Sequence, residues 1–229
     1  MFHLFAVGHF FALGGDSVLG IQVVARAQER GIGLRAGQLF EHQTIAELAA
    51  AAGELGLTGE VEAHGPAPLT PIQRWFFAQD IPHGHFNQAI LLEVPAALDA
   101  AHLAAALGHV QADHAALRLR FTRGADGWSQ TVLTDAAVGP PPLEVLDVAD
   151  VAELPAIAAR LHASLDITRG PIQRAALIRL GAGARVLWVI HHLAVDAVSW
   201  RILVPDLATA LRQLRSEERR VGKECEDLC

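Results

Sequence analysis

Two adjacent histidines and an aspartate near residue 195 could perform acid–base chemistry. His191 and His192 follow the apolar run 186–190, and Asp196 lies four residues after His192. A histidine at the end of a strand that faces a cleft is a suitable general base, because its pKa lies close to neutral pH. A nearby carboxylate can then fix the local geometry. His192, His191 and Asp196 are therefore the candidate catalytic residues.

A metal site is the alternative for these histidines, because His83 and His85 form a second close pair. Zinc is usually held by four ligands drawn from cysteine, histidine and carboxylate side chains. Neither a cysteine nor a carboxylate at a fitting spacing accompanies the two pairs, so we expect no metal here. A structural, hydrogen-bonded role for the paired histidines stays open.

A serine that follows two glycines and an aspartate could be a site of covalent modification. The run Gly14-Gly15-Asp16-Ser17 precedes an apolar helical pattern. Glycines let the chain turn sharply, and a serine at the start of a helix is exposed with its hydroxyl pointing outward. Serine is also a preferred N-cap residue, so local physics explains the segment equally well as a capped loop.

Residues 11–17, Phe-Ala-Leu-Gly-Gly-Asp-Ser, resemble the Leu-Gly-Gly-(Asp/His)-Ser motif of the carrier (thiolation) domains of nonribosomal peptide synthetases. The resemblance covers residues 10–52 and implies a small all-α four-helix fold, truncated because the family's first helix is missing or replaced by residues 1–9. It implies that Ser17 carries 4′-phosphopantetheine as a covalent cofactor. Asp16 is implied to help present Ser17 to a phosphopantetheinyl transferase.

Residues 191–200 resemble the His-His-x-x-x-Asp-x-x-Ser motif of the condensation superfamily, in the form found in epimerization domains. The continuation Val-Ser-Trp-Arg-Ile-Leu at 198–203 is typical of those domains. Residues 71–76, Pro-Ile-Gln-Arg-Trp-Phe, resemble their opening motif Pro-Ile-Gln-x-Trp-Phe. Ala197 stands where glycine is common, and we expect the loop to tolerate this difference.

The second resemblance implies an epimerase that inverts the α-carbon of an aminoacyl or peptidyl thioester from L to D. The thioester carbonyl acidifies the α-proton, and inversion needs a base on one face and a proton donor on the other. By similarity His192 acts on one face, His191 is structural, and Asp196 holds the loop. The family's second acid/base is a glutamate in a motif further downstream, which this chain does not reach.

The same resemblance implies a mixed fold in which the carrier domain precedes an α/β lobe like that of chloramphenicol acetyltransferase, also truncated. We therefore expect little or no epimerase activity from the isolated polypeptide, and an exposed apolar face that favours aggregation. The implied partners are the adenylation and condensation domains of the same synthetase. Two alternatives remain: a condensation domain that forms peptide bonds, and a carrier or docking module without catalysis.

Periodicity predicts the elements that must position these residues. In the first block we expect a helix after Ser17 that ends at 31–33, and a second helix that begins with the capping box Thr44–Glu47. In the second block, apolar runs predict strands at 87–94, 117–122, 128–133, 172–180 and 185–190, and helices at 99–114, 151–165 and 198–214.

These patterns divide the chain into four segments. They are a partial peptidyl carrier domain at 1–52, a Gly- and Pro-rich linker at 53–68, the N-terminal part of an epimerization or condensation-like domain at 69–214, and a tail at 215–229.

The tail has an unusual composition. It holds both cysteines, Cys225 and Cys229, and the chain's single lysine, Lys223. Residues 215–225 resemble the translation of a common sequencing-adapter oligonucleotide. We therefore expect the tail to be non-native, a hypothesis that resequencing the genomic locus tests.

Overall composition excludes several classes of protein. The 229 residues include 18 basic and 25 acidic side chains, a formal net charge of −7, and 52% of them are hydrophobic. A disordered acidic tail would be less apolar, and a nucleic-acid binder would be basic. Apolar runs are interrupted well before the roughly 18 to 20 residues of a membrane span, and the N-terminus lacks the positive region of a secretory signal. We expect a cytoplasmic protein whose partners include neither nucleic acid nor a membrane.

Overall fold

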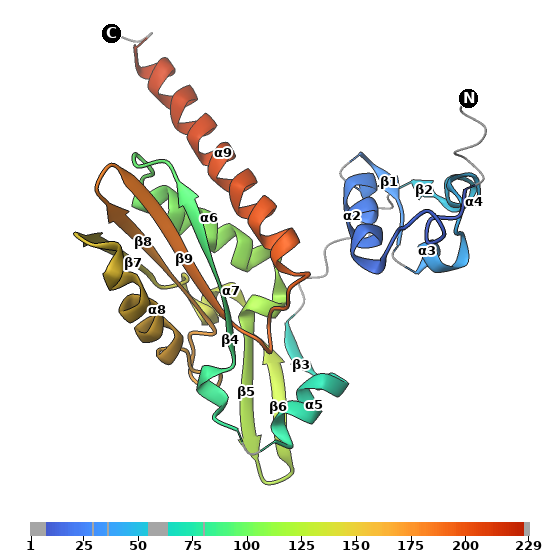
Figure 1. Cartoon of the computed structure of the whole chain (residues 1–229), viewed down its shortest axis with the longest axis horizontal. Coiled ribbons are helices and arrows are strands. Elements are labelled where there is room, and N and C mark those ends of the chain that lie inside the picture. The colour runs from blue at the N-terminus through green and yellow to red at the C-terminus, as the bar shows by residue number, and fades with distance from the viewer. Residues whose placement is uncertain (1–7, 29, 36, 55–63, 80, 227–229) are drawn as a thin grey trace. The chain divides into compact units, whose positions relative to one another are not determined.

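The computed structural model describes residues 8–28, 30–35, 37–54, 64–79 and 81–226 (Figure 1). The chain divides into two compact units, Met1–Glu62 and Ala63–Cys229. The division falls inside the segment 53–68 that was expected to be a linker.

The first unit is a small helical body with a two-stranded ribbon. Its elements are α2 (Ser17–Gln28), β1 (Ile32–Gly33), α3 (Gln38–Glu41), α4 (Ile45–Ala51) and β2 (Gly53–Glu54), with β1 antiparallel to β2. Buried Val24, Leu34 and Leu39 form its core, because α2 and α3 turn their apolar sides toward each other. Between residues 8 and 54 the described residues form three α-helices, so the four-helix fold stays a prediction.

The expected capping box at the start of α4 is confirmed. The hydroxyl of Thr44 accepts a hydrogen bond from the Glu47 backbone N–H at 3.2 Å, and the Glu47 carboxylate accepts one from the Thr44 backbone N–H at 3.1 Å. Two backbone donors that helix geometry leaves unpaired are thereby satisfied. The Thr44 hydroxyl also donates to the Glu47 carboxylate at 2.9 Å, and this bond, followed by the one from the Thr44 backbone N–H, lowers the pKa of the Glu47 carboxyl.

The second unit contains two β-sheets. The four-stranded sheet has the order β4 (Asn87–Val94), β9 (Gly183–His191), β8 (Gln173–Leu180) and β7 (Leu143–Val148). Only the β7–β8 pair is parallel in this sheet. The three-stranded sheet is antiparallel, with the order β3 (Gly65–Ala67), β6 (Gly127–Val132) and β5 (Leu119–Gly124).

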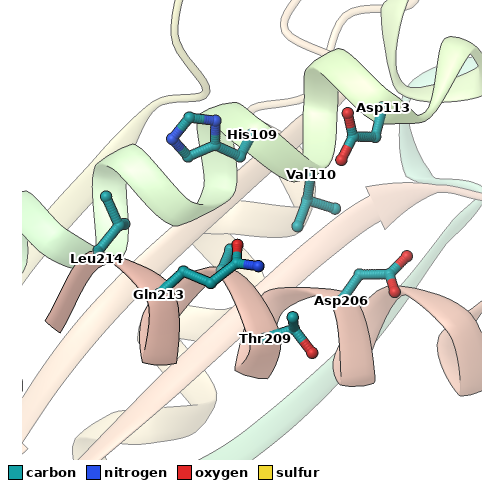
Figure 2. Close-up of a pocket in the computed structure, with 8 residues that line it drawn as sticks. His109, Val110, Asp113, Asp206, Thr209, Gln213 and Leu214 are labelled. Carbon is teal, nitrogen blue, oxygen red and sulfur yellow. The ribbon is translucent and has the colours of Figure 1, made fainter. Parts of the chain in front are cut away.

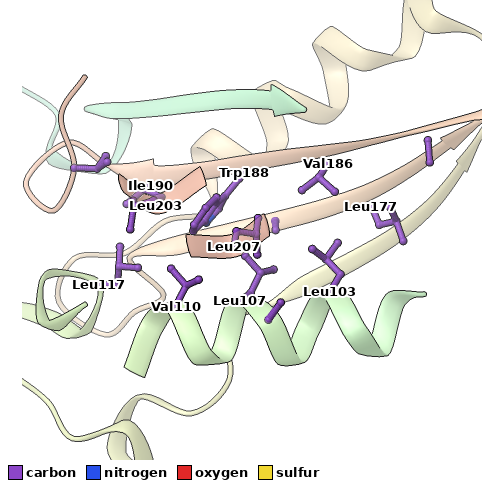
Figure 3. Close-up of a cluster of buried hydrophobic side chains, with 14 residues drawn as sticks. Leu103, Leu107, Val110, Leu117, Leu177, Val186, Trp188, Ile190, Leu203 and Leu207 are labelled. Carbon is purple, nitrogen blue, oxygen red and sulfur yellow. The ribbon is translucent and has the colours of Figure 1, made fainter. Parts of the chain in front are cut away.

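Helices cover both faces of the four-stranded sheet. Along β8, Ala175 and Leu177 pack toward α6 (Ala100–Asp113) and α9 (Trp200–Glu226), whereas Ala176 and Ile178 pack toward α8 (Leu154–Ala163). Figure 3 shows leucines of α6 meeting the side chains of the sheet and of α9. Because strand side chains alternate between faces and both faces are covered, the middle of each inner strand is continuously apolar, at 175–178 in β8 and 186–190 in β9. The remaining short elements are α5 (Pro71–Phe77), η1 (His83–His85), η2 (Ala115–Arg118), α7 (Asp135–Val138) and η3 (Val151–Glu153).

Most of the expected elements of the second unit are present, within a few residues of the expected ends. The strand at 87–94 has the expected bounds. The elements that were not expected include β3, α5, α7 and β7. The sequence of β7, Leu-Glu-Val-Leu-Asp-Val, follows a proline run and carries a strand-like pattern that could have revealed it. The three residues of β3 carry no such signal, because they form a strand only by pairing with β6.

Helix α9 is longer than expected. It begins at Trp200 and continues to Glu226, through most of the segment 215–229 that we expect to be non-native. An adapter-derived run rich in Arg and Glu can form a helix as readily as a native one, so the origin of the tail stays a hypothesis. In the described part of the chain no helix, α9 included, is both long and apolar enough to cross a membrane.

Candidate functional site

Ser17 is the first residue of α2, and its side chain is exposed. The neighbouring Asp16 caps the helix: its carboxylate accepts from the Leu19 N–H at 2.7 Å and its carbonyl from the Gly20 N–H at 2.9 Å. Asp16 is therefore the N-cap residue, and helix capping does not explain why a serine stands at position 17. This arrangement leaves the serine hydroxyl at the mouth of the helix.

The two glycines before Asp16 shape the turn that presents Ser17. Gly14 has φ of +92°, a conformation that side chains rarely adopt. A Cβ on Gly15 would lie 2.6 Å from the ring and the carbonyl oxygen of Phe10. A phosphodiester on Ser17 would also lie at the positive N-terminal end of a twelve-residue helix, which favours a phosphate there. The segment therefore fits a phosphopantetheine group.

His191, the last residue of β9, is fully buried and held by backbone groups. Its Nε2 donates to the His83 carbonyl oxygen at 2.6 Å, and its Nδ1 accepts from the Leu193 N–H at 3.2 Å. Burial lowers the pKa of His191 to about 4. Both ring nitrogens are thus committed, which supports the structural role expected for this residue.

The buried His191 predicts a pH-dependent stability. Its pKa in the folded chain lies below the ordinary value of about 6.5. Between these two pKa values the unfolded chain therefore binds a proton at His191 that the folded chain does not. We expect this group to leave stability unaffected above pH ~6.5 and to reduce it as pH falls toward ~4, by about 3 kcal/mol in all. Urea unfolding at a series of pH values measures the slope. His191→Gln should reduce the slope by close to one proton, whereas exposed His109→Gln should not; equal slopes would contradict the prediction.

His192 begins the loop between β9 and α9 and is half-buried. Its Nδ1 lies 2.8 Å from the Val195 carbonyl oxygen, and its Nε2 lies 3.1 Å from Nε2 of Gln88. The ring stacks on Phe86, with centroids 4.7 Å apart and planes 14° apart. The His192 backbone N–H donates to the Phe86 carbonyl oxygen at 2.7 Å. Phe86, Gln88 of β4 and the Val195 carbonyl oxygen therefore orient this imidazole.

Asp196 organises the loop after His192. One carboxylate oxygen accepts from the Ser199 hydroxyl at 2.7 Å, the Ser199 N–H at 2.8 Å and the Val198 N–H at 3.0 Å. The Ser199 hydroxyl bond and then its backbone bond lower the pKa of Asp196. Ser199 in turn accepts the first backbone bonds of α9 through its carbonyl oxygen. These contacts support the loop-holding role expected for Asp196.

A cavity of about 400 Å³ borders His192. Its walls include Phe76, Phe86 and Val195, and exposed Ile72 and Trp75 lie at its edge. Such a mostly apolar hollow with few polar groups is the usual form of a small-molecule site.

Helix α5 contributes a wall of this cavity and is hydrogen-bonded to the loop between β9 and α9, called here the histidine loop. Gln73 is buried, forms a capping box with Thr70, and donates to the Leu193 carbonyl oxygen at 3.3 Å. The motif at 71–76 thus lies beside the motif at 191–200, although more than 100 residues separate them. Sequence reasoning linked the motifs by resemblance, and the structure brings them together physically.

Sequence reasoning did not single out Gln88, the residue that reaches His192. The apolar run predicts the strand 87–94 but does not indicate a role for the polar pair at its start. Asn87 pairs with His191 and Gln88 with Ile190 in the antiparallel register of β4 and β9. Two polar side chains at the start of a mostly apolar strand were the available signal.

The second histidine pair lies close by but contributes differently. His83 provides the carbonyl oxygen that binds His191, and the ring of His85 lies 5.8 Å from that of His162. Burial, followed by the nearby His85, lowers the pKa of His162. Within the residues that the structure describes, no three His, Cys, Asp or Glu side chains are placed to hold a metal ion.

A further cavity lies between α6 and α9, away from the histidine loop (Figure 2). It has a volume of about 370 Å³ and is lined by polar residues that include His109, Asp113, Asp206 and Gln213. Asp206 already binds His114, with Oδ2 and Nε2 2.7 Å apart. This hollow therefore follows from how the two helices pack.

Comparison with known proteins assigns both units. Residues 8–52 match the phosphopantetheine attachment site family, and residues 63–225 match the condensation domain family. The chain is 49% identical over 223 residues to chondramide synthase of Chondromyces crocatus and 44% identical over 227 residues to a linear gramicidin synthase of Brevibacillus parabrevis. These matches cover 91% and 92% of this chain, but only 6% and 4% of the relatives. A nonribosomal peptide synthetase of Lecanicillium is 39% identical, over 87% of this chain and 2% of its own length.

Solved structures agree with the fold. The epimerization domain from the third module of tyrocidine synthetase B is 29% identical, with a TM-score of 0.64, over 68% of this chain and 36% of that one. The first condensation domain of the CDA synthetase is 26% identical, with a TM-score of 0.57, over 66% and 40%. The α/β fold of the second unit is thus the chloramphenicol-acetyltransferase-like fold of condensation domains. The chain belongs to the condensation domain family of nonribosomal peptide synthetases, and a phosphopantetheine attachment domain precedes the condensation domain in the sequence.

Proposed function

We propose that the chain is the part of a synthetase module that carries an aminoacyl or peptidyl thioester on Ser17 and inverts its α-carbon from L to D. The observation that carries the proposal is the placement of His192, whose Nε2 contacts no backbone group in the described structure, beside a mostly apolar cavity. An imidazole in such a position can exchange a proton with a bound substrate.

Ser17 supplies the attachment point in this proposal. The phosphopantetheine arm, when bound, presents the substrate as a thioester whose α-proton is acidified. Asp16 ends the helix and leaves the serine exposed, and the two glycines hold the turn open. These residues bind and present the group, whereas His192 and its neighbours would act on the substrate.

Two observations favour epimerization over peptide-bond formation. The run Val-Ser-Trp-Arg-Ile-Leu at 198–203 is typical of epimerization domains. The solved epimerization domain also resembles this chain at a higher TM-score and identity than the condensation domain of the CDA synthetase. Peptide-bond formation is the second candidate, because solved condensation domains share the fold.

Attachment at Ser17 is tested by intact mass. We expect incubation with coenzyme A and a broad-specificity phosphopantetheinyl transferase to add one phosphopantetheine mass. Ser17→Ala should abolish the gain, and Ser216→Ala, which changes an exposed serine of α9, should not. A gain that persists in Ser17→Ala, or no gain in a chain shown to be folded by circular dichroism, would contradict the assignment.

Epimerization is tested in a chimera. Because the chain matches 36% of the solved tyrocidine epimerization domain, residues 63–214 can replace the matching part of that domain. With a loaded carrier in D₂O, an epimerase incorporates deuterium at the α-carbon and yields both stereoisomers. Peptide-bond formation with an offered aminoacyl acceptor, without deuterium incorporation, would favour the second candidate instead.

A further inference from the structure

We propose that Gln88, held by Trp200, is a positioning residue that keeps His192 in the tautomer with its hydrogen on Nδ1. Nε2 is then the atom that exchanges the substrate proton. The inference deepens the proposed function and rests on it for the role of His192. It stands on three contacts that link β4, the histidine loop and the first residue of α9.

The first contact fixes the orientation of the Gln88 amide. The indole N–H of Trp200 lies 2.9 Å from Oε1 of Gln88. An indole N–H can only donate, so the amide must present its carbonyl oxygen to Trp200. The Trp200 ring is held in turn by an edge-to-face contact with the buried Trp188, with centroids 5.5 Å apart. The amide NH₂ of Gln88 therefore points the other way.

The second contact follows from this orientation. The NH₂ nitrogen of Gln88 lies 3.1 Å from Nε2 of His192. An amide NH₂ can only donate, so Nε2 of the imidazole must accept and carries a lone pair. A hydrogen on Nε2 would set two donors against each other.

The third contact places the imidazole hydrogen on the other nitrogen. Nδ1 of His192 lies 2.8 Å from the Val195 carbonyl oxygen, which can only accept. The hydrogen bond made by one ring nitrogen decides which nitrogen is protonated. Both bonds of His192 thus select the same tautomer, and the Phe86 stack fixes the plane of the ring.

The arrangement also explains how the lone pair stays available. A hydrogen bond from a neutral amide is weak in net terms, so a substrate proton can replace it. Once Nε2 holds a proton, Gln88 can accept from it only by turning over and giving up the Trp200 bond. The Gln88–Trp200 pair therefore favours the unprotonated Nε2 to which the site returns after each exchange.

The test is ¹⁵N NMR of the full chain labelled with ¹⁵N-histidine, at about pH 8, where histidine is neutral. The His192 signals are assigned by their loss in His192→Gln. We expect Nδ1 to show the shift of a protonated ring nitrogen and Nε2 that of an unprotonated one. The reverse pattern, or a mixture of both tautomers, in the unchanged chain would overturn the inference.

Variants separate positioning from a merely structural role. In Gln88→Glu the carboxylate can only accept, so a hydrogen on Nε2 is favoured and the Nε2 signal should move toward the shift of a protonated nitrogen, while Nδ1 keeps its hydrogen against the Val195 carbonyl oxygen. In Trp200→Phe the amide is free to turn, so a mixture of tautomers is expected. Gln213→Glu, an exposed change on α9, should leave the His192 signals unaltered. Unchanged His192 signals in both folded variants would overturn the inference.

Failure of this inference and failure of the proposed function give different results. The NMR shifts need no substrate and no turnover. The expected tautomer in a chain whose chimera incorporates no α-deuterium would leave the positioning intact and remove the function. The wrong tautomer in an active chimera would remove the positioning role and leave the proposed function intact. If Gln88→Glu does not fold, Trp200→Phe and the unchanged chain still decide the matter.

Discussion

Replacing His192 by glutamine is expected to reduce α-deuterium incorporation by the chimera by about 10²- to 10⁴-fold. The side chain retains a similar reach and polarity but loses the group that accepts a proton near neutral pH. Two titratable side chains line the cavity in the described structure, His192 and Asp196, and the Asp196 carboxylate is engaged by Ser199 and Val198. Chiral analysis of the released amino acid and mass spectrometry of deuterium uptake measure the effect.

The matched control is His109→Gln, because His109 is an exposed histidine of α6 outside that cavity. It should retain the rate of the parent chimera. Phosphopantetheine attachment to Ser17 in the full chain should be unchanged in both variants, because attachment involves the first unit. A His192→Gln chimera with a rate within a few-fold of its parent would remove His192 as the acid/base residue.

Truncating Trp188 is expected to cause the largest loss of stability in the second unit. Trp188 is fully buried in the core that α6, α9 and the four-stranded sheet share (Figure 3). Its indole N–H also donates to Oε1 of Gln173 at 3.0 Å. Trp188→Ala removes the ring, leaves a cavity and strips a buried acceptor of its donor, so we expect a loss of about 3–5 kcal/mol.

Urea unfolding followed by circular dichroism measures this loss. Trp75→Ala is the control, because Trp75 is 54% exposed, and its truncation should change stability by only about 0.5 kcal/mol. Trp188→Phe retains a ring and should lose less than Trp188→Ala, which keeps the comparison measurable if the alanine variant is unfolded. A loss below about 1 kcal/mol for Trp188→Ala would show that this core does not depend on the indole.

Local patterns sufficed for the elements whose stability depends on near neighbours in the chain. The strand at 87–94 and the helix at 99–114 were predictable because apolar periodicity reports which face is buried. Thr44 and Glu47 are three residues apart, so their capping box was readable directly. The motifs at 11–17 and 191–200 likewise stand in single short runs.

Other features depend on segments far apart in the sequence. Strand β3 exists only because 65–67 pairs with β6, about 65 residues later, and β7 is parallel to β8 through a crossover that contains α8. Pairing of this kind depends on register between distant segments, which no local propensity encodes.

The sequence by itself determined which residues have the chemistry: a serine on a glycine turn, a pair of histidines at a strand end, and an aspartate in the following loop. Resemblance distinguished the two histidines by role, but only the tertiary structure decided the surroundings in which they differ. It buries His191 against the His83 carbonyl oxygen and places His192 beside a cavity, in reach of Gln88. The reason is physical: the environment of an imidazole is set by atoms that folding brings from 104 and 108 residues away, not by its neighbours in the chain.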